Sequence, residues 1–595
     1  MRFWSKTLWT AAVASLALGG SLQAQEAGLF IAPPTAETRA SSPPPLRLAE
    51  RAATAPLAEL GSAPLMERER LAELARWNQS RRLPVKNGFA RSLPALVRLE
   101  ISPSLATRAS GPMAGGVLER AADGRLVWGA ELRVADAYRV RLHLSGADLP
   151  TGTQLWVYGE QESVGPFGLE LRGPNGDLWT PSVGGGVVRL EAAFPAGARS
   201  GGFLVDQVLE LFELDEHGTP ITLQTRGTTP PCLVDAQCVS SSTFDVVDLA
   251  QRAVALIQFI DGGSGFICSG GLINDQASSG TPYFLTANHC FDNQSAATTL
   301  EAFWDFTSAT CDGPAPSINS VPRSNGSTLL ATNPTSDFTF LRLTSIPSNR
   351  VLLGWNANAS AVTNGTVLNR ISHPMGLKQH FSRNHVDTSA LTCTGASRPN
   401  FIYETYSPGL GDQGGTFGGS SGSPVIRAGG QVVGQLTGGC GPNPSDGCDY
   451  DNADVDGAFS VTFPSISTFL TGGGGNLCIE DADTACLVGN RFKVEVSYQT
   501  GPPQNLSGQA MVAPAGTDNS GLFYFFNGDN WEMLLKVLDA CSLNNRFWVF
   551  YAATTNVGFT VTVTDTQNGT PKTYTNAIGN AALPIQDTNA FATCP

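Results

Sequence analysis

The cysteines constrain the fold of this chain more than any other feature. All twelve lie at Cys232 or beyond, so a cysteine-free first part is followed by a cysteine-rich remainder. The sequence contains no C-x-x-C pair and no Cys/His cluster of the kind that binds zinc. Disulfide bonds are therefore the expected role of these cysteines, and such bonds persist in an oxidising compartment.

The N-terminus has the pattern of an export signal. Arg2 and Lys6 give a positively charged start, and Leu8 to Gly20 form a short apolar run. Leu22-Gln-Ala24 then supplies a cleavage site that ends in a small residue. Residues 1–24 thus predict a signal peptide and a secreted protein. No later apolar run is longer and free of charge, so we expect no membrane span.

The composition favours several β-rich domains. The chain has 595 residues, which is too long for one domain, and its 65 glycines and 38 prolines suit turn-rich β structure. A net charge of −14 argues against a nucleic-acid partner, because phosphate contacts need a basic face. The expected fold class is therefore mostly β.

Turn signals divide the chain after the signal peptide. Residues 25–226 contain one expected helix, near Glu67 to Arg82, and then alternating strands from about Leu99 to Leu214 that predict a β-sandwich. Residues 227–471 are a second β-rich region. The glycines of 472–475 form a flexible linker.

The C-terminal part, residues 476–595, is the third expected β domain, a β-sandwich with strands such as Phe559 to Thr564. It contains no residue pattern to which we assign chemistry. Its cysteines can close two internal bridges and leave eight cysteines for the middle region; they are Cys478, Cys486, Cys541 and Cys594.

Three short segments of the middle region each carry a reactive side chain. His289 follows the strand-like run Tyr283-Phe-Leu285, Asp337 begins the buried strand Phe338 to Leu343, and Ser421 stands in a tight glycine turn. Taken singly, each has an ordinary structural explanation: a packed histidine, a turn aspartate or a linker. Together they match one template, in order and in suitable local settings, which favours a His–Asp–Ser triad.

The residue types fit nucleophilic catalysis. The Ser421 hydroxyl becomes an effective nucleophile when the His289 imidazole takes its proton. A buried Asp337 carboxylate fixes the imidazole tautomer and stabilises its charged form. Glycines around the serine let the backbone amides of Gly419 and Ser421 converge on the developing oxyanion. This chemistry requires neither a cofactor nor a metal.

These segments resemble the chymotrypsin-like (trypsin-fold) serine peptidases, and within them the secreted bacterial lysyl endopeptidases. The resemblance covers roughly residues 227–470. It rests on Cys232 and Cys238 six apart, Tyr283-Phe-Leu-Thr-Ala-Asn-His289-Cys290, Ser336-Asp-Phe-Thr339, Gly419-Ser-Ser-Gly-Ser-Pro424 and Gly434-Gln-Leu436. It implies a trypsin-like double β-barrel catalytic domain over 227–471, flanked by an N-terminal β-rich propeptide and a C-terminal β-sandwich.

The resemblance also implies a disulfide pattern for the middle region. The implied bridges are Cys268–Cys290 and Cys238–Cys311, with Cys232 joined to Cys440 or Cys448. Cys393 would take whichever cysteine remains.

The family's maturation point implies that the mature protease starts at Gly227, directly after Arg226. Residues 25–226 would then be a propeptide that assists folding or inhibits the enzyme. An enzyme that releases itself here cleaves after a basic residue. The alternatives are that Arg226 is incidental or that another protease makes the cut.

The acid-rich segment Asp446 to Phe459 is the second indication of specificity. In the resembled family an Asp at this register lies at the base of the S1 pocket, and Asp454 is the match, with Thr437 and Gly438 as further pocket residues. A buried carboxylate selects a basic P1 group. The family's pocket histidine is replaced by Thr437, and no tryptophan occurs in 389–399, so preference for Arg or for Lys both stay open.

The same segment has a second interpretation as a calcium site, because calcium is bound by clustered carboxylates. The residues concerned are Asp449, Asp451, Asp454 and Asp456.

The sequence therefore predicts a secreted, monomeric serine endopeptidase that acts after Arg or Lys, with polypeptide substrates and its own propeptide as partners. Two rival hypotheses are a secreted adhesin on an inactive protease scaffold and a serine protease with a different P1 preference.

Overall fold

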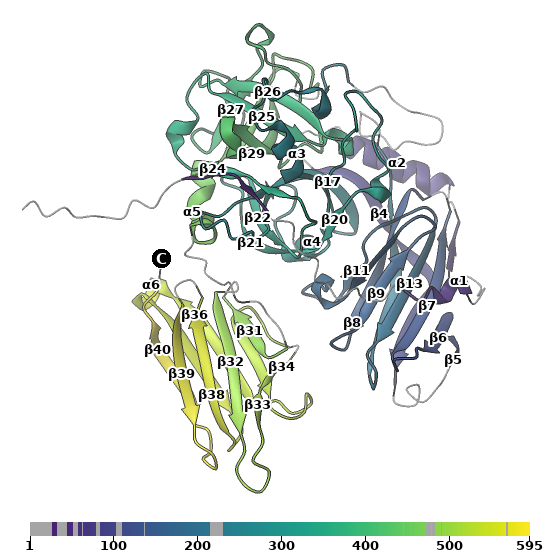
Figure 1. The fold of residues 1–595 in the computed structure, drawn as a ribbon, viewed down its shortest axis with the longest axis vertical. Coiled ribbons are helices and arrows are strands. Elements are labelled where there is room, and N and C mark those ends of the chain that lie inside the picture. Colours follow the sequence, from purple (N-terminus) through teal and green to yellow (C-terminus); the bar gives the residue numbers. More distant parts are fainter. Residues whose placement is uncertain are drawn as a thin grey trace, which may run out of the picture.

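The computed structural model describes residues 26–32, 45–51, 58–61, 64–78, 84–102, 110–135, 137–214, 230–443, 446–471, 478, 482–488, 491–513, 515–566 and 569–594. The expected signal peptide, the expected linker 472–475 and the processing residues Arg226 and Gly227 lie outside these ranges. Three β-rich bodies are seen, with the N-terminal body against the central one and the C-terminal body at the lower left (Figure 1).

Two rings of six strands make up the central body. The first consists of β16 (Val254–Asp261), β17 (Ser264–Ile273), β18 (Tyr283–Ala287), β22 (Phe338–Leu343), β21 (Ser327–Asn333) continued by β20 (Arg323–Asn325), and β19 (Glu301–Phe303). The second consists of β25 (Val367–Ser372), β26 (His380–Val386), β27 (Phe401–Thr405), β30 (Ala453–Ala458), β29 (Gln431–Cys440) and β28 (Pro424–Arg427). The prediction of a mostly β chain with a trypsin-like double barrel is confirmed.

Several barrel strands, such as β16, β18 and β30, are buried along nearly their whole length, so both of their faces are covered. Leu285 and Phe340 of the first barrel share one core with Ile371 and Phe381 of the second. The helix α5 (Phe459–Leu470) covers this core with its buried face. The two barrels are thus joined by a continuous apolar interior, and their polar seam can hold a site.

The N-terminal body is a sandwich of two antiparallel layers. One layer contains β9 (Gln154–Tyr158), β13 (Val187–Phe194), β7 (Leu126–Val134) and β6 (Gly116–Arg120). The other contains β8 (Arg139–Asp148), β14 (Gly201–Leu211) and β4 (Val85–Ile101). Trp128 and Leu190 from the first layer meet Leu142 and Val205 from the second in one buried core.

The expected helix is present. The helix α2 spans Pro64–Asn78, and the last four residues of the prediction, 79–82, lie outside the described ranges. The Asn78 side chain bonds both the amide and the carbonyl of Lys86 in β4, at 2.8 and 2.9 Å. A tertiary contact therefore ties the last described residue of the helix to β4.

The strand β4 joins the N-terminal sandwich to the first barrel. It pairs with β14 along most of its length, and its first residues pair with β17, where Val85 is opposite Ile267. The sequence pattern places the first strand at Leu99, which is too late. Gly88 interrupts the alternation because it lies between two strands, and a Cβ there would meet the Glu210 carbonyl oxygen at 2.5 Å.

Buried ion pairs reinforce this junction. Glu301 of the first barrel is fully buried and is paired with Arg141 of the sandwich at 3.5 Å and with Arg323 at 3.0 Å. Glu162 of the sandwich is paired with Arg323 at 2.8 Å. Burial opposes the charge of Glu301, but these arginines hold its pKa below the ordinary value.

The disulfides of the central body follow the implied pattern and resolve its one open point. The bonded pairs are Cys268–Cys290, Cys238–Cys311, Cys232–Cys448 and Cys393–Cys440. Cys232 thus pairs with Cys448, the second of its two alternatives.

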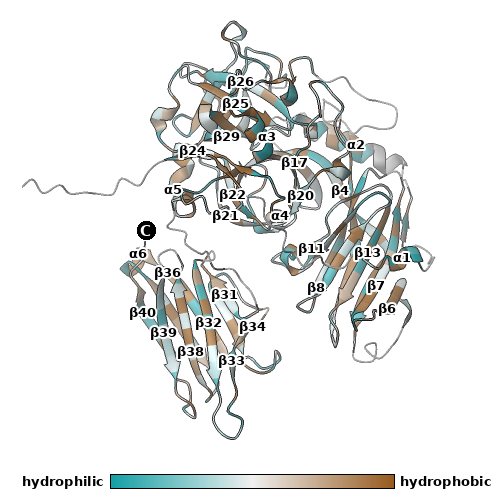
Figure 2. Ribbon diagram, in the orientation of Figure 1, coloured by the Kyte–Doolittle hydropathy of each residue, from teal (hydrophilic) through white to brown (hydrophobic). Residues whose placement is uncertain are grey.

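The C-terminal body is a β-sandwich of two five-stranded sheets, as expected. Apolar and polar residues alternate along strands such as β32 (Phe492–Gln499) and β38 (Gly558–Asp565), so one face of each sheet packs inward (Figure 2). Its two internal bridges are Cys478–Cys486 and Cys541–Cys594.

Across the described ranges, no helix has the length and apolar character needed to cross a bilayer.

Replacing Glu301 by Gln should weaken the junction, because it leaves the buried Arg141 guanidinium without its counter-charge and removes one of the two carboxylates paired with Arg323. We expect the full chain, with Ser421→Ala to prevent processing, to lose about 3–5 kcal/mol of unfolding free energy at neutral pH. Since the folded-state pKa of Glu301 is lowered, the difference should be present above its unfolded value and fall away as the pH drops through the folded value. Urea unfolding across this pH range measures the effect.

The matched control is Glu495→Gln, which removes an exposed pair with Lys493 and should change the unfolding free energy little. An equally small effect of Glu301→Gln would contradict the assigned role of the buried pairs.

Candidate active site

His289 lies two residues after the end of β18, a strand that pairs with β17 on one side and β22 on the other. The neighbouring Cys290 is bonded to Cys268 of β17, so the turn that carries the imidazole is fixed by a covalent bond as well as by the sheet. The His289 side chain is mostly buried, with 16% of its surface exposed.

Asp337 lies directly before β22 and faces this turn. Its carboxylate accepts two hydrogen bonds from His289, one from Nδ1 at 2.7 Å and one from the backbone amide at 2.9 Å. The residue has a φ of 52°, in the left-handed region that Asp adopts more readily than most residues. Because Nδ1 faces the carboxylate, the other ring nitrogen, Nε2, is directed away from it and is available as a base.

Ser421 stands in a turn that only glycines can build on either side. Gly419 has a φ of 89° and Gly422 a φ of 79°. A Cβ at Gly422 would meet Thr286 Oγ1 at 2.2 Å, and one at Gly419 would meet the His373 carbonyl oxygen at 2.8 Å. The backbone amides of Gly419 and Ser421 donate to no other described residue, which suits an oxyanion hole.

Ser269 of β17 connects the serine turn to the histidine strand. Its amide donates to the Ser421 carbonyl at 2.8 Å, and its hydroxyl donates to the Gly419 carbonyl at 2.8 Å. Its own carbonyl accepts from Thr286, three residues before His289, at 2.8 Å. The three predicted triad residues therefore belong to one hydrogen-bonded unit.

The structure brings His289 and Asp337 into direct contact but does not join His289 to Ser421 by a hydrogen bond. Nε2 of His289 is buried and has no hydrogen-bond partner among the described residues. In proteases without substrate the bond between the base and the nucleophile is often long.

A cleft of about 240 Å³ lies at the His289 end of this unit. Its lining residues include His289, Asp337, Thr437, Gly438 and Val455, but not Ser421. Thr437 and Gly438, which the resemblance assigns to the S1 pocket, thus share a cleft with the predicted catalytic base.

Asp454 lies next to the cleft and is almost completely buried. Its position beside the cleft follows from the strand register, because Gly439 of β29, which lines the cleft, is opposite Asp454 of β30. Its carboxylate accepts hydrogen bonds from Thr416 at 2.6 Å, from Tyr406 at 2.8 Å and from Arg370 at 3.1 Å. Sequence reasoning missed Arg370 and Tyr406. The available signal was a single arginine within the otherwise uncharged strand Val367–Ser372.

The calcium hypothesis is not supported by the geometry. No three of its four carboxylates lie close enough together to share an ion in the described part of the chain. Asp454 and Asp456 instead bond Arg370 inside the second barrel, whereas Asp449 accepts from the Asp451 amide in an exposed turn. Asp449 and Asp451 lie in the turn before β30, whereas Asp454 and Asp456 lie on β30, so the four carboxylates do not form one site.

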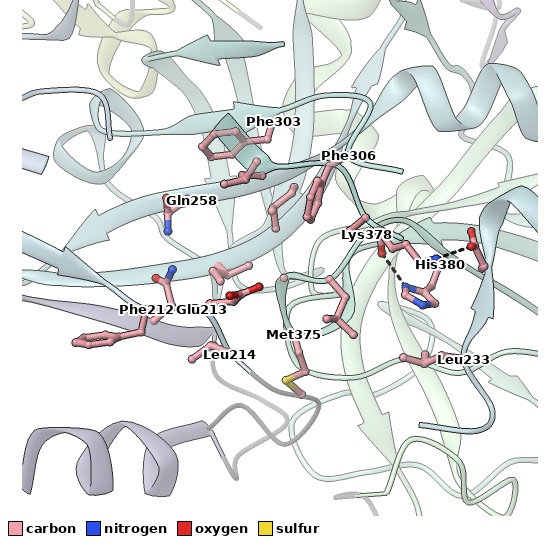
Figure 3. Close-up of a pocket in the computed structure, with 18 of the residues that line it drawn as sticks. Phe212, Glu213, Leu214, Leu233, Gln258, Phe303, Phe306, Met375, Lys378 and His380 are labelled. Atoms are coloured by element: carbon pink, nitrogen blue, oxygen red, sulfur yellow. Dashed lines mark hydrogen bonds and ion pairs between the residues drawn. The ribbon is translucent and has the colours of Figure 1, made fainter. Parts of the chain in front are cut away.

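A larger cavity, of about 590 Å³, lies elsewhere, between the N-terminal sandwich and the barrels (Figure 3). Phe212 and Leu214 of the sandwich and Phe306 and Met375 of the barrels are among the residues that line it. It contains none of the three triad residues. We therefore assign the smaller cleft as the candidate active site.

Asp337→Asn should leave the fold intact and lower kcat for a reporter peptide by about 10⁴, because an amide cannot hold the imidazole in the tautomer that accepts the serine proton. The control is Asp292→Asn, an exposed aspartate close by in the sequence, which should retain full activity. Similar activity in the two variants would contradict the assignment of Asp337.

The residues matched by a family model include His289, Asp337 and Ser421. Residues 226–453 match the family model described as the C-terminal domain of lysyl endopeptidase. The lysyl endopeptidase of Pseudomonas aeruginosa is 28% identical over 350 residues, which cover 56% of this chain and 71% of that protein. Two solved structures are similar at low TM-scores. The MamO protease domain from Magnetospirillum magneticum has a TM-score of 0.25 and 15% identity, covering 36% of this chain and 96% of that one. Deg5 has a TM-score of 0.26 and 13% identity, covering 38% and 94%.

Proposed function

We propose that this chain is a secreted serine endopeptidase that cleaves after basic residues and is made as a self-processing preproprotein. The observation that carries the proposal is the double hydrogen bond from His289 to Asp337, tied through Ser269 to the glycine turn of Ser421. The similarity of residues 226–453 to lysyl endopeptidase supports the same reaction class.

The chemistry follows from the roles of the three side chains. Nε2 of His289 takes the proton of the Ser421 hydroxyl as the oxygen attacks the scissile carbonyl, and Asp337 stabilises the imidazolium that forms. The amides of Gly419 and Ser421 bind the developing oxyanion. The imidazolium then protonates the leaving amine, and water releases the acyl group by the same steps in reverse.

The basic P1 preference is supported by Asp454. A buried carboxylate next to the cleft favours a cationic side chain, since the ion pair offsets a desolvation cost that a neutral side chain cannot repay. The residue before the expected mature start, Arg226, is itself basic.

The N-terminal sandwich is proposed as the propeptide. Its strand β4 begins beside the serine turn, where a Cβ on Gly418 would lie 2.7 Å from the Val85 side chain. Its pairing with Ile267 covers the barrel strand that carries Ser269. A segment in this position adds a strand to the first barrel, so it can support the folding of the barrel.

Release of this propeptide should not require insertion of a new N-terminal amine next to the nucleophile. Ser420 occupies the position where such an amine would need a carboxylate, and its hydroxyl bonds Ser372 at 3.1 Å. The serine turn is therefore already held by neutral groups.

Ser421→Ala should prevent both catalysis and maturation. We expect the wild-type culture fluid to contain a species that starts at Gly227, and the variant to retain the full proprotein, as measured by intact mass and N-terminal sequencing. A Gly227 start that persists in the variant would show that another protease makes the cut. Wild-type protein with no hydrolytic activity would favour the adhesin hypothesis.

Asp454→Asn should lower kcat/KM for Arg and Lys reporter peptides by about 10²–10³, because the buried counter-charge for P1 is lost. Asp451→Asn, in the exposed part of the same segment, is the control and should be unaffected. A wild type that prefers a Glu reporter would contradict the basic preference.

A further inference from the structure

A buried arginine lies behind the carboxylate that we propose for the base of S1. Arg370 of β25 has no exposed surface, and its guanidinium reaches three carboxylates. Nη1 donates to Asp454 at 3.1 Å, and Nη2 donates to Glu404 at 3.0 Å and to Asp456. The inference below concerns this cluster and rests on the proposed function.

The second barrel brings the three acids together. Asp454 and Asp456 are two residues apart on β30 and therefore share one face of the strand. Glu404 of β27 is directly opposite Asp454 in the register. Like charges placed opposite each other on a sheet repel, so this arrangement requires a cation such as Arg370 at its centre.

The geometry favours one shared proton in this cluster. Burial and then the nearby Asp456 carboxylate raise the pKa of Glu404 well above its ordinary value. Glu404 Oε2 and Asp456 Oδ2 are buried oxygens without a donor among the described residues. A proton held between these two carboxyl groups satisfies both oxygens and accounts for one of the negative charges.

The remaining charges do not cancel. Burial raises the pKa of Asp456 as well, so the proton is shared by Glu404 and Asp456 and that pair keeps one negative charge. Arg370 contributes one positive charge, and Asp454 is the further carboxylate beside it. Burial opposes the charge of Arg370, but the carboxylates around it raise its pKa further, so the guanidinium stays charged. Burial and then Asp454 raise the pKa of Tyr406, which therefore donates as a neutral phenol.

We propose that Arg370 and Asp456 are specificity-positioning residues that set the charge behind S1. Arg370 neutralises Asp456 and orients Asp454, so a single net negative charge remains for the P1 side chain. Neither residue touches substrate in this account. The preference for a basic P1 group depends on this charge balance as well as on the presence of Asp454.

The charge balance behind S1 can be tested with substitutions that remove or restore charge but change the size of the side chain little. Asp456→Asn leaves Arg370 to compensate Asp454, so kcat/KM for Arg and Lys reporters should fall by about 100-fold relative to a Gln reporter. The double variant Asp456→Asn with Arg370→Gln restores one net negative charge. It should recover the ratio of basic to neutral cleavage to within about tenfold of wild type.

Glu404→Gln is the matched control, because replacing a protonated carboxyl by an amide leaves the net charge unchanged. Its ratio of basic to neutral cleavage should stay within about threefold of wild type. A loss as large as that of Asp456→Asn would overturn the assigned protonation and the proposal with it.

Active-site titration and thermal melting of each secreted variant separate selectivity from folding. If Asp456→Asn does not fold, the double variant is the test. A double variant that retains the preference for basic reporters supports the proposal, and a double variant that loses this preference overturns it. If the double variant folds but its ratio of basic to neutral cleavage is as low as that of Asp456→Asn, the proposal is overturned and the cluster has only a structural role. A wild type that cleaves no basic reporter would instead refute the proposed function.

Discussion

Ser269 is the residue on which the arrangement of the site depends. It is completely buried where the two barrels meet, and its three polar groups bond the turn of Ser421, the backbone of Gly419 and the strand that leads to His289. Its hydroxyl also accepts from the His373 amide at 3.0 Å. Each barrel alone supplies only part of a triad, so the register between them decides whether the parts meet.

Buried charge is the second theme of the structure. One cluster, around Glu301, lies between the N-terminal sandwich and the first barrel, and the other, around Arg370, lies inside the second barrel. Buried ion pairs contribute little net stability compared with apolar residues of the same size, but removing one partner is costly. Incorrect assembly would therefore leave buried charges unpaired in both clusters. The Glu301 cluster favours correct docking of the sandwich, and the Arg370 cluster favours the observed geometry behind Asp454.

Local patterns predicted much of the fold and the triad. The strand Phe338–Leu343 matches its predicted bounds, and the His289 and Asp337 motifs lie together at the ends of adjacent strands. These features depend on short-range alternation and on turn chemistry, which the sequence carries directly.

Features created by long-range pairing were not predictable in the same way. The side chain of Asn78 in α2 bonds Lys86 of β4, and the first residues of β4 pair with β17. Both contacts join different elements, so no local pattern indicates them. The role of Arg370 requires three strands to converge, and no single segment indicates it. The acidic segment around Asp454 could be interpreted from the sequence as a calcium site or as part of the S1 pocket. The sequence does not show that two of its carboxylates face Arg370, a cation from a distant part of the same chain.

The most direct test of the central claim is to locate the adduct of a serine-directed phosphonate by peptide mass spectrometry. The account predicts one adduct, on Ser421, which forms in the wild type and is lost in His289→Ala although that protein remains folded. An adduct on another serine, or equal labelling without the imidazole, would contradict it.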